Sequence, residues 1–173
     1  MNQPPQTTPV SEAAISAYED TVIPWADAQA ALADARTFWL STQGPEATAH
    51  VRPHFAVWVD STLYFTANLD SRKARNLARD PRCTIATQNN DLDLVVEGSA
   101  AQVADEGTLQ RVADAYIAKY GWPDEVRNGA FTATFGAPTA GPPPYDVFAV
   151  SPTTIYAFGN GPATRWRFLS RTD

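Results

Sequence analysis

Residues 47–59 read Ala47-Thr48-Ala49-His50-Val51-Arg52-Pro53-His54-Phe55-Ala56-Val57-Trp58-Val59. The residues fall into two alternating sets, one running from Ala47 to Val59 and the other from Thr48 to Trp58. This period of two is typical of a β-strand, because successive side chains of a strand point to opposite faces. Pro53 has no amide hydrogen to donate to a sheet, so we expect the strand to lie at an edge or to contain a bulge there.

Further strands and helices are predicted on both sides of this stretch. Residues 37–42 and 63–67 are expected to form strands joined to it by the turns Gly44-Pro45 and Asp60-Ser61, which gives a three-stranded meander. Later strands are expected at residues 83–87, 94–103, 145–150, 154–158 and 164–168. Helices are predicted at residues 25–35, from Asp70-Ser71 to Asp80-Pro81, and at residues 106–120. Mostly sequential strands with few helices indicate a mainly β, antiparallel barrel with helices outside.

The chain is expected to be one domain with a short tail. Residues 1–10 are polar and contain prolines, and we expect a disordered tail there, followed by a single domain over residues 11–173. A glycine- and proline-rich loop is predicted at residues 123–144. A loop of this length is usually a functional or an interface element.

The composition narrows the class of protein. The 173 residues carry a net charge of −6, which argues against broad binding to nucleic acids or to anionic membranes. No apolar run approaches the roughly 18 residues that a membrane span needs, and the N-terminus lacks a signal-peptide pattern. Cys83 is the only cysteine, which excludes a disulfide within the chain, and it is interpreted as a small buried apolar residue. We therefore expect a cytoplasmic protein.

The strongest local signal is a basic segment at the start of the second predicted helix, Ser71-Arg72-Lys73-Ala74-Arg75-Asn76-Leu77-Ala78-Arg79. Its apolar face is expected to consist of Ala74, Leu77 and Ala78. Cations at a helix N-terminus oppose the helix dipole, so they lower stability unless an anion binds there. A phosphate would gain charge-assisted hydrogen bonds from the side chains of the first turn. The alternative interpretation is a solvated basic helix face.

Two strand patterns offer further candidates. His50, Arg52 and His54 share one face with Trp58, and they would line either a ligand groove or an exposed polar surface. Two histidines without a third ligand argue against a metal site. The stretch Thr164-Arg165-Trp166-Arg167-Phe168 also alternates. It is either a final barrel strand with its two aromatic residues in the core, or the source of an arginine for a site on a second subunit.

Several motifs, in this order and spacing, resemble the pyridoxamine 5′-phosphate oxidase-like split-barrel superfamily. They are Ala49-His50-Val51-Arg52-Pro53, Leu63-Tyr64-Phe65-Thr66, Ser71 to Leu77, Asp80-Pro81-Arg82, and Val95-Val96-Glu97-Gly98-Ser99-Ala100. Three later motifs look like an actinobacterial-type branch that commonly uses coenzyme F420, a deazaflavin. These are Ala118-Lys119-Tyr120-Gly121, Gly136 to Pro144, and Thr164 to Phe168.

The resemblance implies a split β-barrel that forms a homodimer with two cofactor sites at the interface. The phosphate of the cofactor would lie against Ser71-Arg72-Lys73, and its ring system along the strands of Arg52–Phe55 and Tyr64–Thr66. The implied cofactor-binding residues are Arg52, Pro53, His54, Phe55, Tyr64, Thr66, Ser71, Arg72, Lys73, Arg75, Trp166 and Arg167, with no metal.

The implied activity is hydride transfer between reduced coenzyme F420 and a small conjugated organic substrate. An FMN-dependent oxidoreductase of the same fold is one alternative, and a non-catalytic flavin- or haem-binding protein is another. His54 and Tyr145 are candidates for proton delivery after hydride transfer. The loop at residues 123–144 is expected to fold over the dimer interface or the cofactor pocket.

Overall fold

The computed structural model describes residues 8–89, 91–122, 125–134, 136 and 140–169. Its helices are α1 (Trp25–Asp34), α2 (Arg72–Arg79) and α3 (Glu106–Tyr120), with a 3-10 turn at Pro45–Ala47. Its strands are β1 (Ser11–Ala14), β2 (Phe38–Gln43), β3 (Ala49–His54), β4 (Ala56–Val59), β5 (Thr62–Ala67), β6 (Arg82–Asn89), β7 (Leu92–Gln102), β8 (Glu125–Arg127), β9 (Ala130–Thr132), β10 (Asp146–Phe158) and β11 (Ala163–Arg167). Within the described residues, no helix is long and apolar enough to cross a membrane.

One large antiparallel sheet forms the body of the molecule. Its strands follow the order β1-β11-β10-β7-β6-β2-β3, while β5 pairs with β10 and β4 pairs with β5. The long strand β10 joins two parts of the sheet, because residues 146–150 pair with β5 and residues 154–158 pair with β11. A bulge between Pro152 and Thr154 separates the two halves, which were predicted as separate strands. The prediction of a mainly β, antiparallel split barrel is confirmed.

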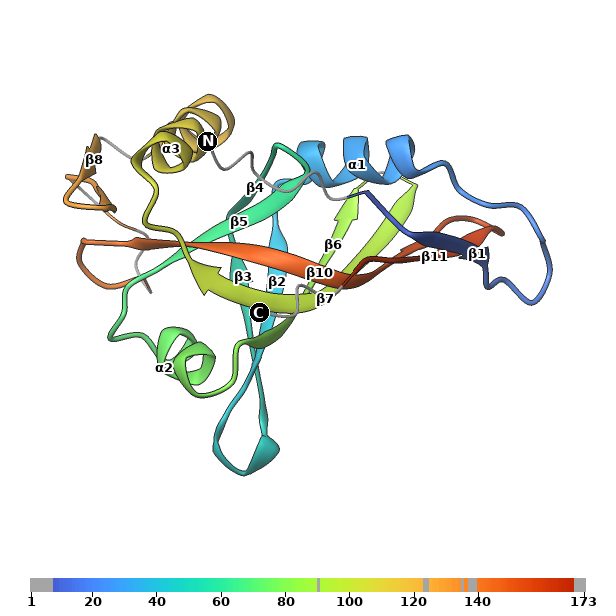
Figure 1. Ribbon diagram of the computed structural model, residues 1–173, viewed down its shortest axis with the longest axis horizontal. Coiled ribbons are helices and arrows are strands. Elements are labelled where there is room, and N and C mark those ends of the chain that lie inside the picture. Colours follow the sequence, from blue (N-terminus) through green and yellow to red (C-terminus); the bar gives the residue numbers. More distant parts are fainter. Residues whose placement is uncertain (1–7, 90, 123–124, 135, 137–139, 170–173) are drawn as a thin grey trace.

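The helices lie on different sides of the barrel. Figure 1 shows α1 and α3 on one side and α2 on the opposite side, with the β2–β3 hairpin extending away from the barrel near α2. The main core fills the barrel and includes Phe38, Phe65 and Trp166. A second, smaller cluster under α3 includes Tyr116 and Tyr145. α2 adds Ala74 and Leu77 to the main core and also makes polar contacts with the sheet.

The expectation of one continuous strand over residues 47–59 is wrong. β3 ends at His54 and pairs with β2, whereas β4 begins at Ala56 and pairs with β5. The chain turns at Phe55 from the projecting hairpin into the barrel, so the expected meander is two hairpins. Side chains continue to alternate through the bend, and the sequence pattern therefore does not reveal it. β3 lies at the edge of the sheet, as Pro53 predicts.

Three smaller differences concern segments with weak sequence patterns. Val10, which was expected in the disordered tail, donates its amide to the Arg167 carbonyl at 2.8 Å, and β1 continues this pairing with β11. Residues 1–7 lie outside the described part of the chain. The expected loop contains the β8–β9 hairpin in its first half. On α2, Ala74 and Leu77 are buried as expected, but Ala78 is exposed and Asn76 takes its place on the buried face.

Candidate anion-binding site

The site is built on the first turn of α2, where the basic segment begins. Ser71 is the N-cap, and its Oγ accepts a hydrogen bond from the Ala74 amide at 3.3 Å. Arg72 and Lys73 occupy the first turn, with Arg72 exposed and Lys73 half-buried. No acidic residue lies in this turn. The positive end of the helix dipole and the charges of Arg72 and Lys73 therefore combine to give a positive potential at this turn.

β3 brings a third cation and two histidines to this turn. Burial and the charges of Arg52, Arg72 and Lys73 lower the pKa of His50. Burial and the charge of Arg52 lower the pKa of Lys73 in the same way. The charges of Arg52, Arg72 and Lys73 thus all act on His50, and that of Arg52 also acts on Lys73. We refer to Arg52, Arg72 and Lys73 as the cation cluster.

The cation cluster has no acidic partner among the residues that the structure describes. The ion pairs there are Arg82–Asp80 at 2.7 Å, Arg111–Asp60 at 3.0 Å and Arg127–Glu125 at 2.6 Å. Arg52 donates to its neighbouring backbone carbonyl at Val51, at 2.8 Å. Arg75, two residues after Lys73 on α2, donates to the Asp70 carbonyl at 2.5 Å. Three clustered cations without a carboxylate can bind a multivalent anion such as a phosphate.

His54 lies beside the cation cluster and against the barrel core. Its ring packs against Phe65, with the ring centroids 5.6 Å apart, and its Nδ1 lies 3.2 Å from the Phe55 carbonyl oxygen. Its Nε2 is buried without a hydrogen-bond partner among the described residues. Burial and the charge of Lys73 lower the pKa of His54 to about 3, although the Phe55 contact opposes this shift. The imidazole is therefore neutral near pH 7.

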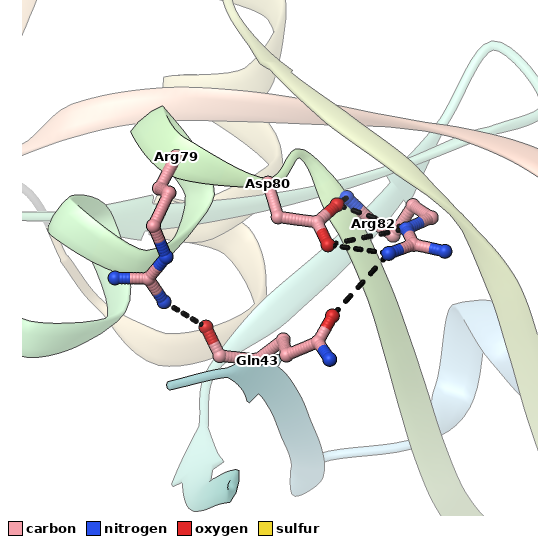
Figure 2. Close-up of polar contacts among 4 residues, drawn as sticks. All are labelled: Gln43, Arg79, Asp80 and Arg82. Carbon is pink, nitrogen blue, oxygen red and sulfur yellow. Dashed lines mark hydrogen bonds and ion pairs between the residues drawn. The ribbon is translucent and has the colours of Figure 1, made fainter. Parts of the chain in front are cut away.

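Polar contacts at the other end of α2 hold the helix against β2 (Figure 2). Arg79 donates to the Gln43 carbonyl at 2.5 Å, and Arg82 donates to Gln43 Oε1 at 3.3 Å. The Arg82 side chain also donates three hydrogen bonds to the Asp80 carboxylate, at 2.9, 3.2 and 2.7 Å. Beneath them, the buried Asn76 donates to Thr42 Oγ1 at 3.0 Å. The buried contact between Asn76 and Thr42 holds the middle of α2 against β2, whereas the contacts of Arg79 and Arg82 lie at the exposed surface.

Four other predicted cofactor residues lie apart from the cation cluster. Pro53 and Phe55 occupy the opposite face of the β3 segment, where both are exposed. Tyr64 and Thr66 are buried on β5, and Tyr64 belongs to the core cluster under α3. These residues were expected along the ring system of the cofactor and not at its phosphate, so their role stays a prediction.

The two predicted residues of β11 are also distant from the cluster in the sheet. Trp166 is fully buried in the main core beside Trp25, with ring centroids 5.3 Å apart, so its side chain is a core residue. Arg167 is exposed on β11, which lies toward the edge of the sheet opposite β3. Tyr145, the second candidate for proton delivery, is buried under α3 and donates to the Gly141 carbonyl at 2.6 Å.

The sequence interpretation missed the residues that hold the bend after His54. Tyr116 OH donates to the Phe55 carbonyl at 2.9 Å, and Tyr120 OH donates to the Ala56 carbonyl at 2.9 Å. Helical spacing assigned both tyrosines to an apolar face, and this pattern carries no information about their hydroxyl groups. The motif Ala118-Lys119-Tyr120-Gly121 was the available signal, because Lys119 Nζ also donates to the Ala56 carbonyl, at 3.3 Å.

Comparison with known proteins identifies a family. The family model described as pyridoxamine 5′-phosphate oxidase matches residues 25–159, which include β2 to β10 and the whole cation cluster. No curated protein matches the chain.

Solved structures with the same fold have diverse names. A conserved hypothetical protein from Mycobacterium tuberculosis has a TM-score of 0.62 and 20% identity, and the match covers 80% of this chain and 86% of that one. An F420 reductase has a TM-score of 0.52 and 20% identity, with coverage of 73% and 94%. A haem-binding protein from Mycobacterium smegmatis has a TM-score of 0.61 and 16% identity, with coverage of 85% and 60%. At these identities the likeness establishes the fold alone.

Proposed function

The chain belongs to the pyridoxamine 5′-phosphate oxidase family, and on that premise we propose that it is an oxidoreductase that uses coenzyme F420. The proposed reaction is hydride transfer between the reduced cofactor and a small conjugated organic substrate. The observation that carries the proposal is the cation cluster of Arg52, Arg72 and Lys73, which lacks acidic partners in the described chain. The F420 reductase of the same fold favours a deazaflavin.

The chemistry of the donors fits the phosphate of such a cofactor. Guanidinium and ammonium groups bind phosphate oxygens through charge-assisted hydrogen bonds, and Ser71 adds a hydroxyl at the helix start. Arg52, Arg72, Lys73 and Ser71 would therefore hold the phosphate. The cofactor, when bound, supplies the hydride chemistry, and the protein supplies binding and orientation. His54 has a pKa of about 3 and is neutral near pH 7, so it is poorly suited to deliver a proton.

Two other functions remain as alternatives, each with its own support. The family model favours an FMN-dependent enzyme, because an FMN phosphate would fit the same cations. The haem-binding protein of the same fold favours a non-catalytic role. Absorption spectra after addition of F420, FMN or haem separate the three, since each ligand has distinct bands that shift on binding.

The decisive test compares Lys73→Ala with Arg79→Ala, a matched change at the other end of the same helix. Hydrogen bonds to charged groups contribute about 1.5–3 kcal/mol each, so Lys73→Ala is expected to weaken cofactor binding by roughly 10- to 150-fold. Arg79→Ala is expected to leave the affinity within a few-fold of wild type, because Arg79 already has a protein partner. Fluorescence titration with F420 and with FMN measures both. If wild type and Lys73→Ala bind each cofactor with equal affinity, the cation cluster is not the phosphate-binding site.

A homodimer is part of the proposal. Trp39, Val51 and Phe158 are 51%, 44% and 41% exposed, and they are large apolar side chains on strands of the main sheet. Exposed apolar groups on a sheet favour a partner surface. We expect a dimer that buries more than the roughly 1,200 Å² of weak contacts. Sedimentation of the wild-type chain at micromolar concentration tests this, and a stable monomer would contradict it.

We also propose that the loop at residues 123–144 folds over the dimer interface or the cofactor pocket, although residues 123–124, 135 and 137–139 lie outside the described part of the chain. Its Pro142 carbonyl accepts a hydrogen bond from Asn68 Nδ2 at 2.9 Å, and Asn68 lies directly before α2. The same Asn68 accepts a hydrogen bond from the Asp70 amide at 2.8 Å. This contact ties the loop to the entrance of the helix that carries Arg72 and Lys73.

A further inference from the structure

A groove between α1 and α3, beside β4, has no part in the proposed function. Figure 1 shows the two helices on the same side of the barrel, with β4 between them. The groove has a volume of about 350 Å³. Its lining residues are apolar except for one lysine, and they are Ala33 of α1, Val57 and Trp58 of β4, and Ala115, Ala118 and Lys119 of α3. A single amine in an apolar groove is a candidate nucleophile.

The contacts of Lys119 place its amine at the α1 side of this groove. Lys119 Nζ donates to the Ala33 carbonyl at 2.8 Å and to the Ala56 carbonyl at 3.3 Å. Ala33 lines the groove itself, and Ala56 directly precedes the lining residue Val57. The side chain therefore spans from α3 to α1. The buried Phe38 ring, whose centroid is 5.2 Å from Nζ, lies against the amine on the core side.

The number of hydrogen bonds suits a neutral amine. A neutral amine has two hydrogens and one lone pair, and the two carbonyls accept those two hydrogens. A charged ammonium group would have a third hydrogen, for which no acceptor is present among the described residues. The lone pair of the neutral form is therefore free to react.

The electrostatic surroundings favour the same form. Burial lowers the pKa of Lys119 to about 8, the charge of Arg36 adds to this effect, and the charge of Asp34 opposes it. β4 has no titratable side chain. The Tyr120 ring, 5.5 Å from Nζ, has a raised pKa and is uncharged near pH 7. Burial in apolar surroundings and a neighbouring cation are the two conditions that make a lysine nucleophilic.

We propose that Lys119 captures apolar aldehydes in this groove as a Schiff base, an activity separate from the proposed cofactor chemistry. The Nζ lone pair attacks the aldehyde carbon, so that a C–N bond forms and the π bond of the carbonyl opens. One amine hydrogen moves to the carbonyl oxygen, and the second leaves with that oxygen as water, which gives a C=N bond. The apolar lining selects an apolar chain or ring, and the nearby charge of Asp34 disfavours a carboxylate as the occupant.

The chain contains only two lysines, Lys73 and Lys119, so each adduct can be assigned. The protein is treated at pH 7 with benzaldehyde or formaldehyde, in buffer and in guanidinium chloride. Imines are trapped with cyanoborohydride and located by peptide mass mapping. The ratio of benzaldehyde to formaldehyde labelling at one lysine reports the groove, because formaldehyde has no side group to bind there. Ala118→Leu fills part of the groove, and Ala78→Leu is the matched change at an exposed alanine of α2.

An amine with a pKa of about 8 is neutral at pH 7 roughly 100-fold more often than an ordinary lysine. A less basic amine is also a weaker nucleophile, so we expect labelling of Lys119 to be about 10-fold faster in the folded protein than in guanidinium chloride. Ala118→Leu should lower the labelling ratio at Lys119 several-fold, whereas Ala78→Leu should leave it unchanged. Lys119→Arg, which keeps the charge but forms no imine, should lose this adduct. Thermal melting checks that each variant is folded.

Two results overturn the proposal. If Lys119 is labelled no faster in the folded protein than in guanidinium chloride, its amine is only a structural link between α3 and α1, or a second copy of the chain covers the groove. If the labelling ratio at Lys119 equals that at Lys73, or does not change in Ala118→Leu, the amine reacts without a binding groove. Neither result affects the cation cluster, which is tested by cofactor titration.

Discussion

Both ends of α2 carry basic side chains, but only those at the C-terminal end have partners within the described part of the protein. At the C-terminal end, Arg79 donates to the Gln43 carbonyl, and Arg82 just beyond the helix is paired with Asp80 at 2.7 Å (Figure 2). At the N-terminal end, Arg72 and Lys73 lie close to Arg52 and have no acidic partner in the described parts of the chain. One end is satisfied by the protein, and the other concentrates unpaired charge.

Elementary electrostatics explains why this difference points to a ligand. Cations near a helix C-terminus interact favourably with the helix dipole, so the C-terminal end needs no function beyond stability. Cations in the first turn interact unfavourably with the dipole and, in the cluster, with each other. An arrangement that lowers the stability of the free protein is typical of a binding site, where the missing charge comes from the ligand.

The largest expected effect comes from reversing charge at the N-terminal end. Arg72→Glu combined with Lys73→Glu is expected to weaken F420 or FMN binding at least about 100-fold, because two charge-assisted hydrogen bonds of about 1.5–3 kcal/mol are lost. The melting temperature should stay level or rise, since acidic residues suit a helix N-terminus. Fluorescence titration and thermal melting measure the two effects.

Arg79→Glu is the matched reversal at the other end. It should lower the melting temperature, because it removes the contact with Gln43 and places a negative charge at the negative end of the helix dipole. If the variant with both Arg72→Glu and Lys73→Glu keeps the wild-type cofactor affinity, the cations at the N-terminal end are only a solvated surface.

The next effect is acid destabilisation through His54. Its pKa of about 3 lies below the ordinary value of 6.5, so between these values the unfolded chain binds a proton that the folded chain does not. Stability is therefore lost as the pH falls through this window, by up to roughly 1.4 kcal/mol per pH unit. In His54→Phe this part of the loss should disappear, leaving the smaller contribution of the same sign from His50. Urea unfolding at several pH values measures the difference, and parallel curves for the two proteins would contradict it.

A smaller effect is expected where α2 is anchored. Asn76→Ala leaves the buried Thr42 hydroxyl without its partner, so the free energy of unfolding should fall by about 1–3 kcal/mol. Cofactor affinity should fall with it, because the first turn of α2 is no longer held beside β3. Denaturant unfolding and cofactor titration are measured on the same preparation. Full stability in Asn76→Ala would show that the anchor lies elsewhere.

The smallest effect is expected for Arg82→Gln. The Arg82 side chain is 75% exposed, and exposed ion pairs contribute little to stability. Both the melting temperature and the cofactor affinity should therefore stay close to the wild-type values. A large loss of affinity here would remove the contrast between the two ends of α2, because it would mean that both ends act in binding.

Where local patterns are strong, the sequence predicted the structure closely. The spacing of apolar residues predicted α3, and Gly121, with φ of 70°, ends it as a glycine in the left-handed region. Ser71 was predicted to cap α2 and does so. β1 was missed because Ser11-Glu12-Ala13-Ala14 has little strand propensity and forms a strand only by pairing with β11.

Within the candidate site, the sequence by itself determined which charges are present and that they begin a helix. Only the tertiary structure decided that Arg52 joins Arg72 and Lys73, that Trp166 is in the core, and that the chain bends at Phe55. The physical reason is that a period of two or of 3.6 reports the faces of one element, whereas pairing joins residues far apart in the chain. Whether a cation has a carboxylate partner, or a histidine nitrogen a donor, depends on those distant neighbours. The difference between paired cations at the C-terminal end of α2 and unpaired cations at its N-terminal end therefore arises only when the sheet has formed.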